Sequence, residues 1–319
     1  MRIVMMGTGP FAVPTLESLW QSDHDVAALV TRPTKPAASK KTILVNPMRE
    51  VAEAHGLPVM DPEDLNTPAA QAAVAAYAPD LLVVCDYGQI LSSESLAVAP
   101  LGGINLHGSL LPKYRGAAPV NWAILNGDVE TGVTVIHMTP RLDAGPCLSA
   151  LRTPLQSNED AVELERRLAL LGVDAVQEAM ELLEDWDGVA PIGVIQDQSL
   201  ATRAPRLRKQ DGLLDWTRSA DEIYNQVRGL KPWPGTYTFV PTPKRGAQRA
   251  IVDTVAVEDG DATAPPGTIV HADAKRLTVA TASHPLSILR LQPAGKRLMT
   301  AEEYLRGNPL QAVQMLVNA

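Results

Sequence analysis

Short apolar runs alternate with helical patterns along the first 188 residues of the chain. At its start, residues 2–20 join the apolar run RIVMM to a glycine-rich turn, GTGPFA, and then to the helical segment VPTLESLW. The run DLLVVCDY at 80–87 is apolar almost throughout, as in parallel strands that are covered on both faces. This alternation predicts a doubly wound α/β domain with a mostly parallel sheet.

The other segments of this region fit the same pattern. We expect further strands at 25–31, 57–60 and 102–107 and at the start of 130–145, and helices at 48–56, 67–78, 117–127 and 157–186. The last of these helices opens on Ser157 and Asp160, a spacing similar to a capping box, and continues as a long amphipathic segment.

The pattern changes after about residue 200. Residues 202–216 form a basic, proline-containing connector, and 219–230 have the pattern of a helix. From there to residue 295, short Thr- and Val-rich runs alternate with Gly and Pro, which predicts a small β-barrel similar to a five-stranded OB fold. We therefore expect two domains, 1–205 and 206–319, with the boundary between residues 200 and 210.

Composition narrows the class of protein. The chain has 319 residues, 45% of them hydrophobic and 20% charged, as in ordinary soluble proteins. Its start is too short and too glycine-rich for a signal peptide, and no run approaches the length of a membrane span, so we expect a cytoplasmic protein with no membrane partner. Cys85 and Cys147 match neither a metal-binding spacing nor a disulfide framework.

Charge is distributed unevenly between the two expected domains. Residues 206–319 carry 15 Lys and Arg against 11 Asp and Glu, a net charge of +4, whereas residues 1–205 carry −12. A basic domain beside an acidic one fits a domain that binds a polyanion. Chance variation in composition is the alternative explanation.

The turn GTGPFA formally matches the dinucleotide-binding fingerprint, with Gly7, Gly9 and Ala12 at its three positions. A nicotinamide site also needs an acidic residue after the second strand, where this chain has Thr31 and Arg32. We therefore do not expect a nicotinamide cofactor. The glycines are better explained by a tight turn through which the backbone approaches another ligand.

Asn105 and His107 end the expected strand at 102–107, and their spacing places both side chains on one face. Asp143 follows the next strand, and we expect the carboxyl ends of parallel strands to bring the three together. An amide and an imidazolium donate to a developing oxyanion, while a carboxylate orients the imidazole or accepts a proton. The set suits acyl transfer to an amine supplied by a substrate, because no Ser or Cys has the context of a nucleophile. The alternative for His107 is a structural histidine, and the scattered histidines predict no metal site.

Longer motifs in the chain resemble the folate-dependent formyltransferases. The similar segments are GTGPFAVPTLESL, VVCDYGQIL, GGINLHGSLLPKYRGAAPVNWAILNGDVETGVTVIHM and LDAGPCL. Two more, LDWTRSADEIYNQVRGLKPWPGTYT and LQPAGKRLMTAEEYLRG, resemble the C-terminal domain of members that act on tRNA. The resemblance covers nearly the whole chain, and its core, Asn-x-His-Gly-Ser-Leu-Leu-Pro followed by Asp-x-Gly, is highly specific.

The resemblance implies an activity and a set of site residues. The formyl group of 10-formyltetrahydrofolate would pass to the α-amine of methionyl initiator tRNA, a step of translation initiation that needs no metal and no obligate protein partner. Residues 1–205 would be catalytic and 206–319 would bind tRNA. The implied catalytic residues are Asn105, His107 and Asp143; those beside the folate are Tyr87, Gly88, Ile90, Leu91, Ser109, Leu110, Leu111 and Pro112; those that bind tRNA are Arg32, Lys35, Lys40, Lys41, Arg206, Arg208 and Lys209.

Two positions depart from the family pattern. The loop that follows residue 31 has lysines but no arginine beyond Arg32, and lysine lacks the bidentate fork of arginine. Asp86 stands where the family usually has a small residue, and it either binds an amine of the pterin or caps the turn.

Alternative functions remain open. A small amine such as an amino-sugar nucleotide or glycinamide ribonucleotide is an alternative acceptor, and a formyltetrahydrofolate hydrolase or a noncatalytic RNA-binding protein are more distant alternatives. The C-terminal barrel favours tRNA over the small acceptors.

Overall fold

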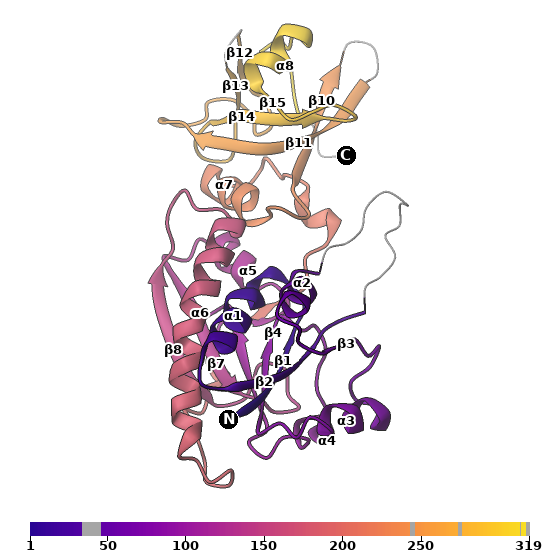
Figure 1. The fold of residues 1–319 in the computed structure, drawn as a ribbon. Coiled ribbons are helices and arrows are strands. Elements are labelled where there is room, and N and C mark those ends of the chain that lie inside the picture. The colour runs from indigo at the N-terminus through magenta and orange to yellow at the C-terminus, as the bar shows by residue number, and fades with distance from the viewer. Residues whose placement is uncertain (34–45, 243–245, 274–275, 313, 317–319) are drawn as a thin grey trace. The chain divides into compact units, whose positions relative to one another are not determined.

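A computed structural model describes residues 1–33, 46–242, 246–273, 276–312 and 314–316 (Figure 1). The chain forms two compact units. The first comprises residues 1–120, 130–154 and 163–205, and the second comprises 121–129, 155–162 and 206–319. Two short segments from the first 162 residues thus fold with the C-terminal region.

A seven-stranded sheet forms the centre of the first unit, in the order β3-β2-β1-β4-β5-β7-β8. The first five strands in this order are parallel, while β7 is antiparallel to β5 and β8 is antiparallel to β7. The predicted mostly parallel sheet is therefore confirmed. The strands are β1 (Arg2–Gly7), β2 (Asp25–Val30), β3 (Val59–Met60), β4 (Leu81–Cys85), β5 (Gly103–His107), β7 (Glu130–His137) and β8 (Cys147–Pro154).

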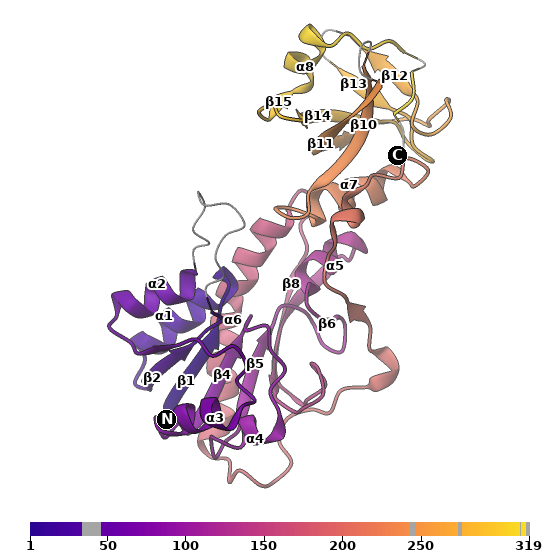
Figure 2. The ribbon, with the colours of Figure 1, turned by 90° about the vertical axis from the view of Figure 1, so that its right-hand side faces the viewer.

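Helices cover both faces of this sheet (Figures 1 and 2). Alternate residues of β1 and β4, among them Val4 and Leu82, pack in one buried cluster with Val74 and Leu96. On the other face, α6 approaches β5 so closely that a Cβ added at Gly172 would lie 2.5 Å from Leu106 Cδ2. The helices up to residue 200 are α1 (Val13–Gln21), α2 (Pro47–Ala54), α3 (Pro68–Ala75), α4 (Ser93–Leu96), α5 (Pro119–Leu125) and α6 (Ala161–Glu184), with 3-10 turns η1 (Pro10–Ala12) and η2 (Gln198–Leu200). Most of α5 belongs to the second unit.

A curled antiparallel sheet forms the second unit, in the order β10-β11-β14-β13-β12, with β15 paired to β14. The predicted OB-like domain is confirmed in this half-barrel form. Its core is apolar and includes the fully buried Trp216, whose Nε1 donates to Thr238 Oγ1 at 3.1 Å. The elements are η3 (Lys209–Gly212), α7 (Ala220–Gly229), β10 (Thr236–Thr242), β11 (Gly246–Val257), β12 (Ile269–Ala272), β13 (Leu277–Val279), β14 (Leu286–Pro293), β15 (Met299–Thr300) and α8 (Ala301–Gly307).

Arg228 ties α7 to the segment 155–162 within the second unit. Its Nη1 donates to the carbonyls of Gln156 and Glu159 at 3.0 Å, and its Nε and Nη2 donate to Asn225 Oδ1 at 3.0 and 2.8 Å. The side chain is buried, and burial lowers the pKa of the guanidinium. The segment 155–162 is therefore held to α7 by a charged group with several acceptors.

Removing this arginine is expected to destabilise the second unit. Arg228→Met keeps the apolar stem but removes the charged donor to two backbone carbonyls and to Asn225, so we expect the free energy of unfolding to fall by about 2–3 kcal/mol. Arg218→Met is the control, because the Arg218 side chain is 39% exposed and forms an ion pair with Glu222 one helical turn away, and such pairs contribute at most about 1 kcal/mol. Equal losses in urea denaturation of the two variants would contradict the account.

Candidate active site

The strand β5 presents Asn105 and His107 on the face of the sheet opposite α6. Ile104 and Leu106 alternate with them, and Leu106 points toward Gly172 of α6. Because side chains alternate along a strand, Asn105 and His107 point the other way, as their spacing predicts. Asn105 is half-buried, and no hydrogen bond joins its side chain to the part of the chain that the structure describes. Its amide is therefore available to a ligand.

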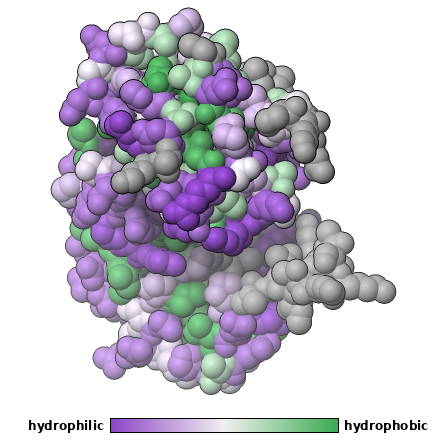
Figure 3. Space-filling view, turned by 90° about the horizontal axis from the view of Figure 1, so that it is seen from above, coloured by the Kyte–Doolittle hydropathy of each residue, from purple (hydrophilic) through white to green (hydrophobic). Residues whose placement is uncertain are grey.

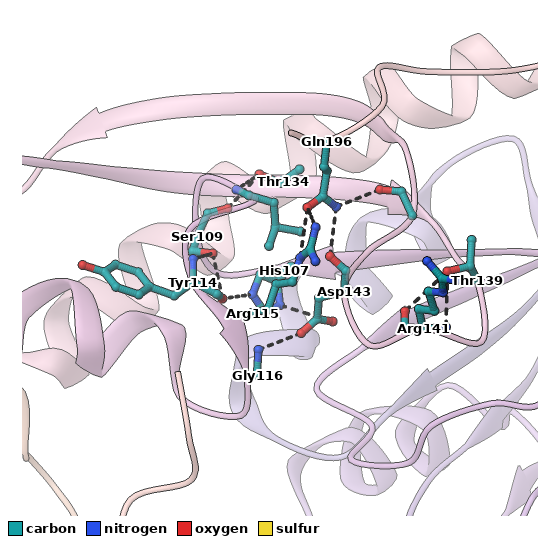
Figure 4. Close-up of polar contacts among 12 residues, drawn as sticks. His107, Ser109, Tyr114, Arg115, Gly116, Thr134, Thr139, Arg141, Asp143 and Gln196 are labelled. Carbon is teal, nitrogen blue, oxygen red and sulfur yellow. Dashed lines mark hydrogen bonds and ion pairs between the residues drawn. The ribbon is translucent and has the colours of Figure 1, made fainter. Parts of the chain in front are cut away.

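His107 is almost fully buried at the end of β5, with 6% of its surface exposed. Its Nε2 lies 2.7 Å from the carbonyl oxygen of Tyr114 (Figure 4). Since a carbonyl only accepts, Nε2 carries the proton of the neutral ring and donates it there. Nδ1 lies on the other side of the ring, 3.9 Å from Asp143 Oδ1. The chemistry of His107 is therefore confined to Nδ1.

Asp143 is held in place by its backbone and by one of its carboxylate oxygens. Its φ of +48° is a left-handed backbone conformation that residues other than glycine rarely adopt. Oδ2 accepts a hydrogen bond from the backbone N–H of Gly116 at 2.8 Å, and this leaves Oδ1 directed at His107. Gly116 itself has a φ of +127°, and an added Cβ would lie 2.4 Å from the carbonyl oxygen of Ala204, so this position requires glycine.

The route that brings Asp143 to His107 differs from the expected one. We expected parallel strands whose carboxyl ends converge, but β7 runs antiparallel to β5, with Ile104 opposite His137. The loop 138–146 therefore starts beside the amino end of β5 and returns along that strand to reach His107. The meeting of the two side chains is as predicted, and its cause is the folded-back loop.

Ser109 serves the local backbone. The residue is buried. Its Oγ donates to the carbonyl of Tyr114 at 3.3 Å and accepts from the Tyr114 N–H at 3.1 Å. Thr134 of β7 fixes the same turn, donating to the Ser109 carbonyl at 2.7 Å and accepting from the Leu111 N–H at 3.1 Å. The half-buried Leu110, Leu111 and Pro112 are the residues of this segment with surface to offer a ligand.

The loop that follows β4 divides into inward and outward residues. Tyr87 and Leu91, with 2% and 1% of their surfaces exposed, pack in the apolar cluster of β1 and α3, and burial raises the pKa of Tyr87 to about 12. Gly88, with φ +79°, and Ile90, which is 59% exposed, face outward. Of the four residues expected beside the folate here, only the latter two have side-chain positions open to a ligand.

Asp86 caps the turn after β1. Its carboxylate accepts the N–H of Gly9, and its carbonyl accepts the N–H of Thr8 at 3.1 Å. A Cβ at Gly9 would lie 1.8 Å from Asp86 Oδ2, so a larger residue there would displace the Asp86 carboxylate. Of the two alternatives for Asp86, capping is the one that the structure shows. The Gly9 N–H that bonds to the Asp86 carboxylate is one of the backbone donors that a dinucleotide phosphate would need.

The surrounding protein raises the pKa of Asp86 to about 6 from its usual 3.8, first by removing water from part of its carboxylate and then through the nearby charge of Glu165, although the residue as a whole stays exposed. The folded state thus holds this proton more tightly than the unfolded chain, so the stabilisation is complete below pH 3.8 and is lost as pH rises through 6. The asparagine of Asp86→Asn does not titrate. We therefore expect the Tm of the variant minus that of the wild type to be larger at pH 7.5 than at pH 5, by roughly 2–4 °C. This figure already includes a reduction for solvent screening. A Tm difference that is independent of pH would contradict this.

The residues expected to bind tRNA fall into three groups. Lys35, Lys40 and Lys41 lie outside the described residues. The Nη1 of Arg32 donates to the carbonyl of Glu63 at 3.1 Å. Arg206, Arg208 and Lys209 are exposed at the start of the C-terminal part of the second unit.

Two general features of the described residues bear on the function. None of their helices is long and apolar enough to cross a membrane. They contain no group of three or more His, Cys, Asp or Glu side chains placed to hold a metal ion, and both cysteines are free thiols.

Family models decide the relationship of this chain to known proteins. The model described as "Formyl transferase" matches residues 1–180, and that described as "Formyl transferase, C-terminal domain" matches residues 206–309. The chain belongs to the formyl transferase family. Asn105, His107 and Asp143 of this formyl transferase all lie within the first match.

Curated relatives extend the similarity over nearly the full length. The methionyl-tRNA formyltransferase of Rhodopirellula baltica is 44% identical over 99% of this chain and 97% of its own. That of Geotalea daltonii is 40% identical over 96% of this chain and 95% of its own.

Solved structures share the fold at low identity. HypX from Aquifex aeolicus in complex with tetrahydrofolic acid matches with a TM-score of 0.64 and 16% identity, and this formyl transferase spans about half of it, 51%. An N-formyltransferase from Helicobacter canadensis, in complex with folinic acid and dTDP-3-aminofucose, matches with a TM-score of 0.63, 15% identity, 91% of this chain and 98% of its own.

Proposed function

We propose that this formyl transferase moves the formyl group of 10-formyltetrahydrofolate to the α-amine of methionyl initiator tRNA, in the cytoplasm, where translation is initiated. The observation that carries the proposal is the free amide of Asn105 beside the buried His107, whose Nδ1 faces Asp143. Full-length relatives named methionyl-tRNA formyltransferase support the choice of acceptor.

The residues present fit a folate. Ile90 and Leu142 are large apolar side chains with 59% and 53% of their surfaces exposed, one in the loop after β4 and one immediately before Asp143. Exposed apolar groups in these two loops, together with the free amide of Asn105, suit a flat ring system that carries polar edges. The folate supplies the formyl group, and the protein supplies its orientation and the charged surroundings of the reacting carbon.

The protein contributes most to the rate by stabilising the oxyanion that forms when the amine attacks. An α-amine has a pKa of about 7.7–8.0, so a substantial fraction is neutral and nucleophilic near neutral pH. Its attack on the formyl carbon places negative charge on the formyl oxygen. The Asn105 amide and a protonated His107 Nδ1 donate to that oxygen, and the carboxylate of Asp143 stabilises the imidazolium. Nε2 takes no part, because it is bonded to Tyr114.

Proton transfer completes the reaction. The new bond joins the amine nitrogen to the formyl carbon, and the bond between that carbon and N10 of the folate breaks. The amine loses one proton and N10 gains one, so the step is balanced without another reactant. Oδ1 of Asp143 is the carboxylate oxygen that Gly116 leaves free, and we assign it to carry this proton, directly or through water.

Residues 206–319 are proposed to bind the tRNA. They carry a net charge of +4 and the exposed Arg206, Arg208 and Lys209. On the β10–β11 pair, the guanidinium of Arg249 lies 4.0 Å from the ring centroid of Tyr237, an arrangement that suits stacking on a base. Seen from above, hydrophilic residues dominate the molecular surface and hydrophobic ones form small groups among them (Figure 3).

Salt dependence distinguishes tRNA from a small acceptor. A tRNA that contacts several phosphates should lose affinity about 10-fold or more between 50 and 200 mM salt, because bound counterions are released. We would measure KM for methionyl initiator tRNA over this range beside transfer to glycinamide ribonucleotide and to an amino-sugar nucleotide. Transfer to a small amine alone, with little dependence on salt, would refute the proposed acceptor.

A further inference from the structure

Gln196 is a buried polar residue next to the proposed active site. It lies between α6 and η2, and 5% of its surface is exposed. Its Nε2 donates to two carbonyl oxygens of the loop 138–146, that of Asp143 at 2.9 Å and that of Gly145 at 2.7 Å (Figure 4). One amide group thus bridges two backbone positions on the loop that carries Asp143.

Arg115 fixes the orientation of this amide. Its Nε and Nη2 lie 3.2 and 2.6 Å from Gln196 Oε1, and its Nη1 lies 2.8 Å from Gln198 Oε1. A guanidinium only donates, so the atom of Gln196 that faces it is the oxygen, and the amino group must face the two carbonyls. Both ends of the Gln196 amide are therefore engaged, and a flipped Gln196 amide would lose its hydrogen bonds to Arg115, Asp143 and Gly145.

The loop needs such support because its path is unusual. Asp143 has left-handed backbone angles, and Gly145 passes so close to His137 that an added Cβ would lie 1.8 Å from the His137 carbonyl oxygen. The carbonyls of Asp143 and Gly145 converge on one donor, which fixes the direction of the backbone between them. Non-glycine residues in this conformation persist when their surroundings hold them.

The two-residue strand β6 (Arg115–Gly116) holds both sides of Asp143. The Arg115 side chain holds Gln196, which bonds to the backbone of Asp143, while the Gly116 N–H bonds to its carboxylate Oδ2. β6 is itself paired with β9 (Arg203–Ala204). These bonds leave Oδ1 of Asp143 as the oxygen that faces His107.

We propose that Gln196 is a positioning residue for formyl transfer: it holds the Asp143 backbone so that Oδ1 faces His107 Nδ1. The inference rests on the proposed function, because it assumes that Asp143 takes part in that reaction. Gln196 itself touches neither substrate. Loss of its two donors is therefore expected to lower the rate of the chemical step and to leave substrate binding largely intact.

Gln196→Met tests this with a side chain of similar size that has no N–H donor. We expect kcat for formyl transfer to fall by about 10-fold or more, and KM for each substrate to change less than about 3-fold, as for an interaction that serves the transition state. Tetrahydrofolate binding, measured by calorimetry, should be retained. Gln198→Met is the matched control, because Gln198 bonds to the same Arg115 but is exposed and does not bond to the Asp143 loop; its kcat should stay within about 2-fold of wild type.

A double-mutant cycle with Asp143→Asn separates positioning from general structural support. If Gln196 acts through Asp143, adding Gln196→Met to Asp143→Asn should lower kcat no further than about 2-fold. Losses that multiply would overturn the proposal, as would an unchanged kcat in Gln196→Met. Should Gln196→Met fail to fold, Gln196→Glu takes its place in the cycle, because it keeps the bond to Arg115 but lacks the donors.

The two proposals fail in different ways. If the wild type forms no formyl-methionyl-tRNA, the proposed function is refuted and the role of Gln196 falls with it. If the wild type is active, Asp143→Asn is impaired and Gln196→Met is not, only the positioning role is refuted.

Discussion

Asn105→Asp is expected to lower kcat for formyl transfer by about 10²–10³-fold, because removing one oxyanion donor typically has an effect of this size. The two side chains are almost the same shape, and Asn105 makes no side-chain hydrogen bond within the described part of the chain. An ionised carboxylate cannot donate, and it repels the negative charge that forms on the formyl oxygen. The measurement is kcat under saturating substrates.

Two controls accompany this variant. Its Tm and its tetrahydrofolate binding should remain near those of wild type. Its rate relative to wild type should rise as pH falls, since a protonated carboxyl group regains a donor. Turnover retained at neutral pH would show that Asn105 does not stabilise the oxyanion.

Asp143→Asn should be equally damaging, with kcat lowered by about 10²–10³-fold through lost proton transfer and lost stabilisation of the imidazolium. The amide oxygen can replace Oδ2 as the acceptor for the Gly116 N–H, so the loop should keep its path. The amino group would then face His107 Nδ1 in the place of Oδ1. A donor at that position favours the neutral ring, which has no proton on Nδ1 to give to the oxyanion.

Asp187→Asn is the matched control, because Asp187 caps the backbone N–H groups of Val189 and Ala190 on an exposed turn. Its kcat should equal that of wild type. A small effect of Asp143→Asn, with the His107→Ala variant inactive, would mean that His107 works without this carboxylate.

Local patterns in the sequence were sufficient for the fold class. The apolar run at 81–85 forms a strand that is buried at every position, and the change of pattern after residue 200 precedes the antiparallel unit. The direction of β7 was not predictable in the same way, because the residues of a covered strand are apolar whichever way it runs. The burial of β7 at positions 131–136 therefore carries no information about the direction of its partner strand.

The site was predictable where one residue pattern fixed the geometry. Asn105 and His107 share a face because a strand alternates, and this holds for any fold that contains the strand. Tyr87 and Leu91 show the limit, since their outward or inward direction depends on the turn at Asp86, where φ is +48°. Nothing in a single sequence marks that turn as left-handed.

Supporting residues were not found from the sequence. Gln196 is 53 positions from Asp143 and belongs to no expected helix or strand, so only the folded chain brings them within 2.9 Å. Arg115 and Gly116 lie in the resemblance segment, but their bonds to Gln196 and Asp143 depend on backbone angles that composition does not reveal. Gln196 stands out as a buried glutamine between two exposed residues, but this burial is visible only in the structure.

Formyl transfer from 10-formyltetrahydrofolate is the most direct test of the proposed function, measured with methionyl initiator tRNA, methionyl elongator tRNA and free methionine, and with His107→Ala as the control. We predict transfer to initiator tRNA alone, and its loss in the His107→Ala variant. No transfer to any of the three by a wild-type protein that binds tetrahydrofolate would contradict the acceptor and point to a small amine. Full transfer by His107→Ala would contradict the active site.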